Sequence, residues 1–200
     1  MPRLVSSRSR NALTGQTFAA LVLAVLAAAV LLASLSQAGA AARPAPCGHA
    51  HAAPRSLSLR QMRTSLLCLI NRARHHHGIH ELDYNGELRD SATAHSVSMV
   101  LDGYFSHQGP GGSVDSRIAR AGYLGRAHRF AVGEDIGGGA GRRYGSPMAV
   151  FEEWMHSPPH RENILDPKFR DAGIGVARGF PFGGRHGAAT YTADFGSRAD

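Results

Sequence analysis

The stretch SPMAVFEEWMHSPPHRENIL, residues 146–165, decides how the centre of this chain folds. Ser146 is a good N-cap residue, and Pro147 suits the first position of a helix. Apolar side chains then recur at helical spacing, at positions 148, 151, 154 and 155. We expect this helix to end before Pro158 and Pro159, because proline removes a backbone donor and clashes with the preceding turn. The stretch also supplies His160, a candidate for the functional cleft.

Two longer helices are expected on the N-terminal side of this stretch. Apolar positions 59, 62, 66, 69, 70 and 73 share one helical face, which predicts a helix over about residues 57–76 that stops at Gly78. Asn85 can cap a second helix, whose face carries positions 88, 92, 95 and 99 and which ends near Asp102–Gly103. A short helix is expected over residues 115–121.

The clearest strands come late in the chain. Phe130–Ile136 predicts a short strand, and the Gly-rich residues after it, GGGAGRR, predict a flexible loop. Gly173–Ala177 and Ala188–Phe195 predict two more strands, joined as a hairpin through FPFGG. Because the main helices precede these strands and do not alternate with them regularly, the expected class is α+β.

The first 40 residues have the order of a secretory signal peptide. Positive charge is followed by the apolar run FAALVLAVLAAAVLLASL, residues 18–35, and then by small residues. Cleavage after Ala38, Ala40 or Ala42 fits the small-residue preference, and predicts a secreted protein, free or associated with the envelope. The alternative is an uncleaved anchor, which would be the only expected attachment to a membrane. The domain prediction is therefore a signal peptide over 1–40, an Ala/Pro/His-rich linker over 41–56 and a globular domain over 57–200.

The two cysteines, Cys47 and Cys68, both follow this leader. An even count in an exported chain favours a disulfide, which would tie the linker to the first helix. Closing a loop of about 20 residues stabilises a fold by about 3 kcal/mol in the chain-entropy model. Two free thiols remain the other interpretation.

The charge pattern excludes one class of partner. The formal charge is +7, but three of the arginines lie in the leader, and the remaining basic residues are spread along the chain. Because blocks of like charge are absent from the sequence, it carries no footprint of nucleic-acid binding.

The order of short motifs resembles one family, the bacterial SCP-like branch of the CAP superfamily of cysteine-rich secretory, antigen 5 and pathogenesis-related proteins. The resemblance runs from about residue 63 to 196. Its motifs, in order, are LINRAR (69–74), LDYNGELRDSATAHSVSM (82–99), YFSH (104–107), SRIARAGY (116–123), GEDI (133–136), WMHSPPHRENIL (154–165), AGIGVA (172–177) and YTADFG (191–196).

The resemblance implies an α-β-α sandwich with a central, mainly antiparallel sheet. It also implies a cleft with two histidines and two acidic residues, which in some members bind a divalent metal. By motif, the histidines are His107 and His160, and the first acid is Glu134. The second acid's position holds Ser157, and the family's usual Asn after the Glu is Asp135. This departure leaves the metal set incomplete.

Several chemical interpretations of these residues stay open. Two imidazoles and one carboxylate form a ligand set that zinc accepts, with water in the fourth position, so zinc or another divalent ion is a candidate cofactor at His107, Glu134 and His160. In the alternative, Glu134 accepts a hydrogen bond from an imidazole and fixes its tautomer. Ser157 and His160 do not predict a serine hydrolase, because Pro158 and Pro159 separate them and the chain has no Gly-x-Ser-x-Gly elbow.

The other histidines have simpler interpretations. His75, His76 and His77 are expected at a solvated helix end, and His95 in the core with its hydrogen bonds satisfied.

Two functions follow for this exported domain. The first is a monomeric binding or interaction module whose cleft takes a lipid, glycan or protein ligand outside the cell. The second is a divalent-metal-dependent hydrolase that uses the same cleft. A structural domain with a vestigial cleft is a third, simpler alternative.

Overall fold

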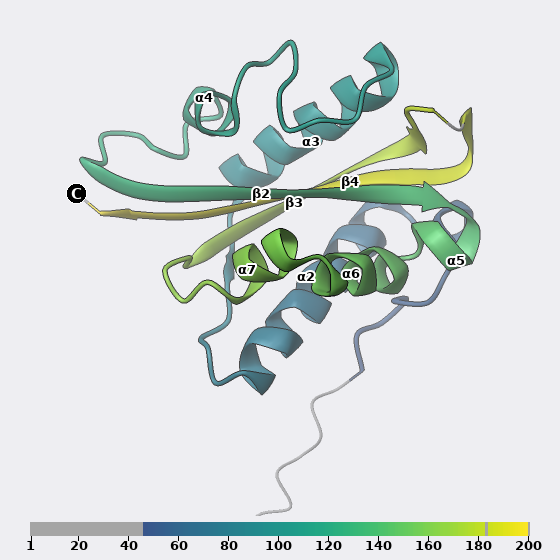
Figure 1. The fold of residues 1–200 in the computed structure, drawn as a ribbon, viewed down its shortest axis with the longest axis horizontal. Helices are drawn as coiled ribbons and strands as arrows, with labels where there is room; N and C mark the ends of the chain where they lie inside the picture. Colours follow the sequence, from purple (N-terminus) through teal and green to yellow (C-terminus); the bar gives the residue numbers. More distant parts are fainter. Residues whose placement is uncertain (1–45, 183, 200) are drawn as a thin grey trace, which may run out of the picture. The chain divides into compact units, whose positions relative to one another are not determined.

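A computed structural model describes residues 46–182 and 184–199, and the predicted signal peptide lies outside them. Four strands form one sheet in the order β1-β3-β4-β2; β1 runs parallel to β3, and the other two pairs are antiparallel. Figure 1 shows α3 and α4 on one face of this sheet and α2, α6 and α7 on the other. The elements are η1 (Pro54–Ser56), α2 (Leu59–His76), β1 (Asp83–Tyr84), α3 (Gly86–Asp102), α4 (Val114–Arg120), β2 (Arg129–Ala140), α5 (Gly141–Gly145), α6 (Pro147–His156), α7 (Pro158–Leu165), β3 (Asp171–Phe180) and β4 (Gly184–Ala199).

This architecture confirms the α+β sandwich with a mainly antiparallel sheet. The larger apolar core lies between the sheet and the α2, α6 and α7 layer, with Trp154 and Tyr191 fully buried in it. A smaller cluster of Leu88, Ile118 and Tyr123 lies on the α3 and α4 side. In the described part of the chain, no helix is long and apolar enough to cross a bilayer.

The predicted helices begin at their capping residues. Ser58 and Gln61 form a reciprocal capping box at the start of α2. Asn85 accepts a hydrogen bond from the Leu88 amide at the start of α3, and Ser146 accepts one from the Ala149 amide at the start of α6. These local bonds explain why sequence alone places three helix starts within two residues.

One prediction about this region was wrong. The predicted loop after Ile136 continues as strand, because β2 stays paired with β4 as far as Ala140. A Cβ at Gly137 would lie 2.7 Å from the Trp154 Nε1 atom, so the glycine gives α6 room to pack there. Pro158 does end the preceding helix, but it also starts α7, since proline is tolerated at the first helical position, where the backbone amide has no intrahelical partner.

The described part of the predicted linker packs against the domain. Cys47 and Cys68 form a disulfide with a Cα–Cα distance of 5.7 Å, which confirms the predicted bridge. The Met148 amide donates to the Ala50 carbonyl, and the Arg178 guanidinium donates to the carbonyls of Pro54 and Leu57. The disulfide holds this segment against the domain, where these backbone carbonyls accept their hydrogen bonds.

Helix α3 lies directly on strand β3, and two glycines make this approach sterically possible. A Cβ at Gly173 would lie 2.0 Å from the Arg89 amide nitrogen, and one at Gly175 would lie 2.1 Å from the Ala92 carbonyl carbon. Both contacts are with helix backbone, which cannot rotate away. The closeness of α3 therefore depends on the sequence Gly-Ile-Gly in β3.

We predict that Gly175→Ala lowers the free energy of unfolding by about 3 kcal/mol, because α3 must move off the sheet to admit the methyl group. Urea denaturation of the purified protein measures this loss. Gly86→Ala is the matched control, since a Cβ there meets nothing within 4 Å. Equal stability of the two variants would contradict the close-packing interpretation.

Candidate functional site

Glu134 lies at the centre of the predicted cleft, on strand β2 and with a side chain that is fully buried. Its Oε1 atom accepts a hydrogen bond from His107 Nδ1 at 2.8 Å. Its Oε2 atom lies 2.5 Å from Arg117 Nη2, which donates to it. The structure thus joins two of the predicted site residues, His107 and Glu134, by a hydrogen bond. It also adds Arg117, which connects helix α4 to Glu134 on strand β2.

Arg117 also fixes the loop that carries His107. Its Nη1 atom donates to the His107 carbonyl at 2.9 Å and to the Gly112 carbonyl at 2.6 Å. One guanidinium on α4 therefore holds both the loop and the carboxylate that orients the imidazole. Sequence analysis missed this role, and the only available signal was the position of Arg117 within the motif SRIARAGY.

His95 lies behind this group on α3 and is buried, as predicted for a core histidine. Its Nε2 atom lies 3.0 Å from the Ser106 carbonyl oxygen and 3.7 Å from Glu134 Oε1. Because the carbonyl can only accept, Nε2 carries a proton. Burial lowers the pKa of His95 below its ordinary value, which keeps the ring neutral near pH 7.

A second buried carboxyl group lies beside Glu134 on the neighbouring strand. Asp194 on β4 is the cross-strand partner of Glu134. Burial and the nearby charge of Glu134 raise the pKa of Asp194 well above its ordinary value. Burial alone would also raise the pKa of Glu134, but the hydrogen bond from His107 and the charge and hydrogen bond of Arg117 lower it. The pair therefore separates into an ionised Glu134 and a protonated Asp194.

His160 lies on α7, in the opposite helical layer, with its ring centroid 6.3 Å from that of Trp154. Its Nδ1 atom is buried and makes no hydrogen bond within the described residues. Burial, and to a smaller extent His107, lower the pKa of His160 below its ordinary value. Asn163 ties this helix to β2, donating to Asp135 Oδ1 at 2.8 Å and to the Glu134 carbonyl at 3.3 Å.

Ser157, at the position of the family's second acid, connects α6 to α7. Its backbone amide donates to the carbonyls of Glu153 and Trp154, and its hydroxyl makes no capping bond to α7. The structure gives no hydrogen bond between Ser157 and the other predicted site residues. Its assignment to the cleft stays a prediction.

The donor set, as folded, does not fit the three-ligand metal centre considered from sequence. Both oxygens of Glu134 are engaged, one by an imidazole and one by a guanidinium. Across residues 46–182 and 184–199, no three His, Cys, Asp or Glu side chains are grouped as a metal site. A metal at His107, Glu134 and His160 stays a prediction.

The arrangement presents one well-oriented imidazole to solvent. The His107 side chain is 47% exposed. Because the ionised Glu134 accepts from Nδ1, the neutral ring offers Nε2 as a hydrogen-bond acceptor. The buried Nδ1 of His160 supplies a second polar atom that lacks a protein partner. The exposed Nε2 of His107 can therefore hydrogen-bond a polar group that approaches from solvent.

The sequence comparisons agree on a family. A family model described as "CAP: Cysteine-rich secretory protein family" matches residues 67–191. The chain is 35% identical over 107 residues to the uncharacterized protein YkwD of Bacillus subtilis (strain 168), a match that covers 54% of this chain and 39% of YkwD. A match to the uncharacterized membrane protein YlbC of the same organism has 30% identity and covers 56% of this chain and 31% of YlbC. The chain spans less than half the length of either relative.

Solved structures show the same fold. An extracellular protein containing an SCP domain from Bacillus anthracis str. Ames has a TM-score of 0.56 and 25% identity, over 70% of this chain and 43% of that one. An outer surface protein from Borrelia burgdorferi has a TM-score of 0.60 and 16% identity, over 72% of this chain and 97% of that one. The second likeness concerns the fold alone.

Asp135, the residue after Glu134, gives the site a measurable pH dependence. Burial raises the pKa of Asp135 to about 8. In the unfolded chain Asp135 ionises at its ordinary pKa near 4, whereas in the folded protein it stays protonated up to about pH 8. Its burial therefore costs no stability below about pH 4, and the folded state loses stability as the pH rises from 4 towards 8.

We predict that Asp135→Asn, a neutral substitution, removes this loss. The advantage of the variant in free energy of unfolding grows by about 4 kcal/mol between pH 5 and pH 8. Urea denaturation at the two pH values measures it. The exposed Asp83, changed to Asn, is the control and leaves the pH profile of the wild type unchanged. A parallel loss of stability in wild type and Asp135→Asn would contradict the buried-acid interpretation.

Proposed function

The chain belongs to the cysteine-rich secretory protein (CAP) family, and from this premise we propose that it is an extracellular or envelope-associated binding module. Its ligand enters the cleft of His107, Glu134 and His160. One observation carries this proposal: both oxygens of Glu134 are bound, so the carboxylate orients the half-exposed His107 imidazole for hydrogen bonding. Glu134 then positions the His107 imidazole, and His107 contacts the ligand.

The other candidate, a metal-dependent hydrolase, needs a different arrangement of the same residues. Glu134 would have to turn from orienting His107 to binding a metal, and if it left Arg117 that buried guanidinium would lose its carboxylate partner. The cleft supplies no alternative nucleophile, because Ser157 makes no hydrogen bond to His160 in the described structure. A binding role therefore requires no change in the hydrogen bonds of Glu134, whereas metal-dependent hydrolysis requires this residue to take on a new role as a metal ligand.

The place of action follows from two kinds of support. The leader over residues 1–40 predicts export, and the similar protein from Bacillus anthracis is described as extracellular. Cys47 and Cys68 form a disulfide, which is typical of oxidising compartments. The ligand is then a lipid, glycan or protein at the cell envelope or beyond it.

Cosedimentation tests the binding role. We predict that the exported protein sediments with purified peptidoglycan or with phosphatidylglycerol vesicles, and that His107→Ala/His160→Ala weakens this binding by about tenfold. The matched control is His75→Ala/His77→Ala, which removes two exposed histidines from the end of α2 and leaves binding unchanged.

Two outcomes would overturn the proposal. Equal binding by the cleft variant and the wild type would remove the cleft from the binding role, and failure of the wild type to bind either material would remove the envelope ligand. A zinc titration of the same proteins distinguishes the metal-dependent hydrolase from the binding module. Micromolar zinc binding that is lost only in the cleft variant would favour the metal-dependent alternative.

A further inference from the structure

Two hollows adjoin each other on the face formed by α5 and α6. The larger, of about 590 Å³, lies between these helices and the ends of β2 and β3. The smaller, of about 290 Å³, lies between the same helices and the segment that precedes η1. Arg143 and Ala149 line both hollows, so the two together form one groove, the α5/α6 groove. His107, Glu134 and His160 line neither hollow, so the groove is separate from the cleft.

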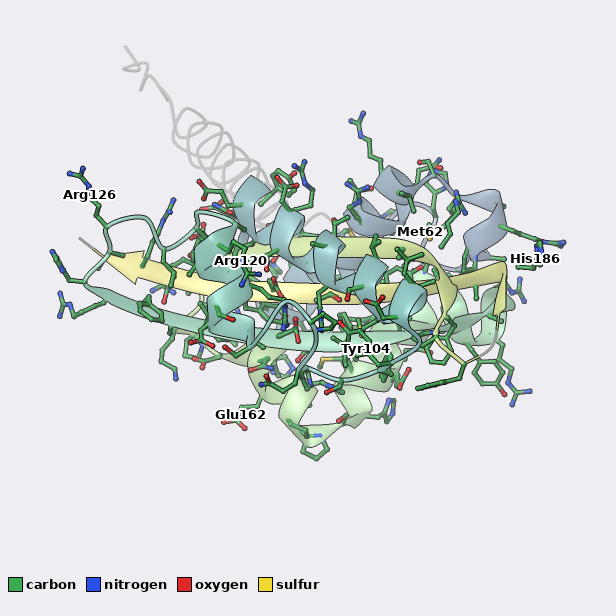
Figure 2. The ribbon with its side chains drawn as sticks, turned by 90° about the horizontal axis from the view of Figure 1, so that it is seen from above. Met62, Tyr104, Arg120, Arg126, Glu162 and His186 are labelled. Carbon is green, nitrogen blue, oxygen red and sulfur yellow. A yellow bond between two sulfur atoms is a disulfide. The ribbon has the colours of Figure 1, made fainter. Side chains whose placement is uncertain are left out.

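Aromatic side chains form one wall of the larger hollow. Tyr144 is 60% exposed, although the Arg143 guanidinium lies 5.3 Å from its ring centroid. Phe180 lines the same hollow, and the ring of Phe182, which is 71% exposed, lies 6.3 Å from that of Phe180. The wall lies beside the β3–β4 hairpin, whose His186 is labelled at one end of the molecule in Figure 2. Exposed aromatic rings that gather around a hollow are typical of a binding surface.

Each hollow also contains a carboxylate and a guanidinium. Glu152 and Glu153 follow Ala149 by three and four residues on α6, so the three lie on one helical face. Glu152 lines the smaller hollow and Glu153 the larger. Across residues 46–182 and 184–199, Arg142, Arg143 and these two carboxylates form no ion pair. Partial burial raises the pKa of Glu153 above its ordinary value.

The mixture of charges decides the class of ligand. A polyanion or an anionic lipid surface would meet the two carboxylates, and a cationic peptide would meet the two guanidiniums. A sugar hydroxyl can donate to a carboxylate and accept from a guanidinium at the same time. The C–H face of a pyranose ring is apolar and stacks on the negative face of an aromatic ring. The groove therefore matches an uncharged sugar both in its polar groups and in its aromatic wall.

We propose that the α5/α6 groove binds an uncharged oligosaccharide, with one sugar ring stacked on Tyr144 in the larger hollow and another ring in the smaller hollow. Glu153 and Arg143 hydrogen-bond the hydroxyl groups of the first ring, and Glu152 and Arg142 those of the second. Because both hollows are used, affinity rises from a single sugar to a chain. The site stands independently of the function proposed for the cleft.

Titration with chitotetraose, the β-linked tetramer of N-acetylglucosamine, tests this site. We expect the wild type to bind it at least about tenfold more tightly than the monomer, which fills only one hollow. Binding should shift the backbone amide resonances of Gly139, Tyr144 and Ala149. Absence of binding to the wild type, equal affinity for the monomer, or unshifted amides at these positions overturns the proposal.

Variants of the aromatic wall test the stacking contact. Tyr144→Ala should weaken chitotetraose binding by about tenfold, whereas Tyr144→Phe, which keeps the ring, should bind within about twofold of the wild type. Tyr84→Ala is the matched control, because Tyr84 is 57% exposed on β1 and lines neither hollow. Equal affinity of Tyr144→Ala and Tyr84→Ala overturns the proposal.

Two further measurements separate the groove from the cleft and from a lipid surface. The cleft variant His107→Ala/His160→Ala should bind chitotetraose as the wild type does, whatever its binding to peptidoglycan. Loss of chitotetraose binding in that variant would assign the sugar to the cleft and overturn the groove. Sedimentation with phosphatidylglycerol vesicles that is lost in Tyr144→Ala, without chitotetraose binding, would assign the aromatic wall to lipid and also overturn it.

Discussion

The guanidinium of Arg117 is the interaction on which the cleft depends. It reaches from α4 to the buried carboxylate of Glu134 on β2, and on its way binds the carbonyls of His107 and Gly112. A buried carboxylate without such a partner would be costly, since removing one member of a buried pair typically costs about 3–5 kcal/mol. The same bonds fix the loop after α3, so the orientation of His107 and the ionisation of Glu134 have a common cause.

The alternation of side chains along β2 connects the two helical layers through adjacent residues. Glu134 meets α4 and the His107 loop on one face of the sheet, while Asp135 meets Asn163 of α7 on the other. Figure 1 shows β2 between these layers. Gly173 and Gly175 let helix α3 pack directly on strand β3. The side of α3 that carries Ser91 and His95 therefore lies at a fixed distance from the sheet. Strand β2 therefore positions the Glu134 group, and strand β3 positions α3 beside it.

The sequence predicted those features that depend on neighbouring residues. Helix starts at Ser146 and Asn85 follow from caps within one turn, and the disulfide follows from a pair of cysteines in an exported chain. The length of β2 could not be predicted in this way, because its glycines are strand only by virtue of pairing with Thr190 and Tyr191 and packing under Trp154. Family resemblance found His107, Glu134 and His160. Their partners Arg117 and Asp194 come from register and helix placement, which no local spacing encodes.

The buried acids of β2 and β4 indicate that these two strands are not optimised for stability alone. Asp194 and Asp135 both have raised pKa values caused by burial, and each has at least one side-chain oxygen without a partner in the described structure. An apolar or amide side chain of similar size at either position would avoid that cost. Natural proteins tend to break such rules where a site requires it. Three carboxyl groups on two neighbouring strands, only one of them compensated by a guanidinium, hold a negative charge at Glu134 and neutral acids around it. Among the described residues of this group, His107 is the half-exposed imidazole, and the ionised Glu134 orients it through Nδ1.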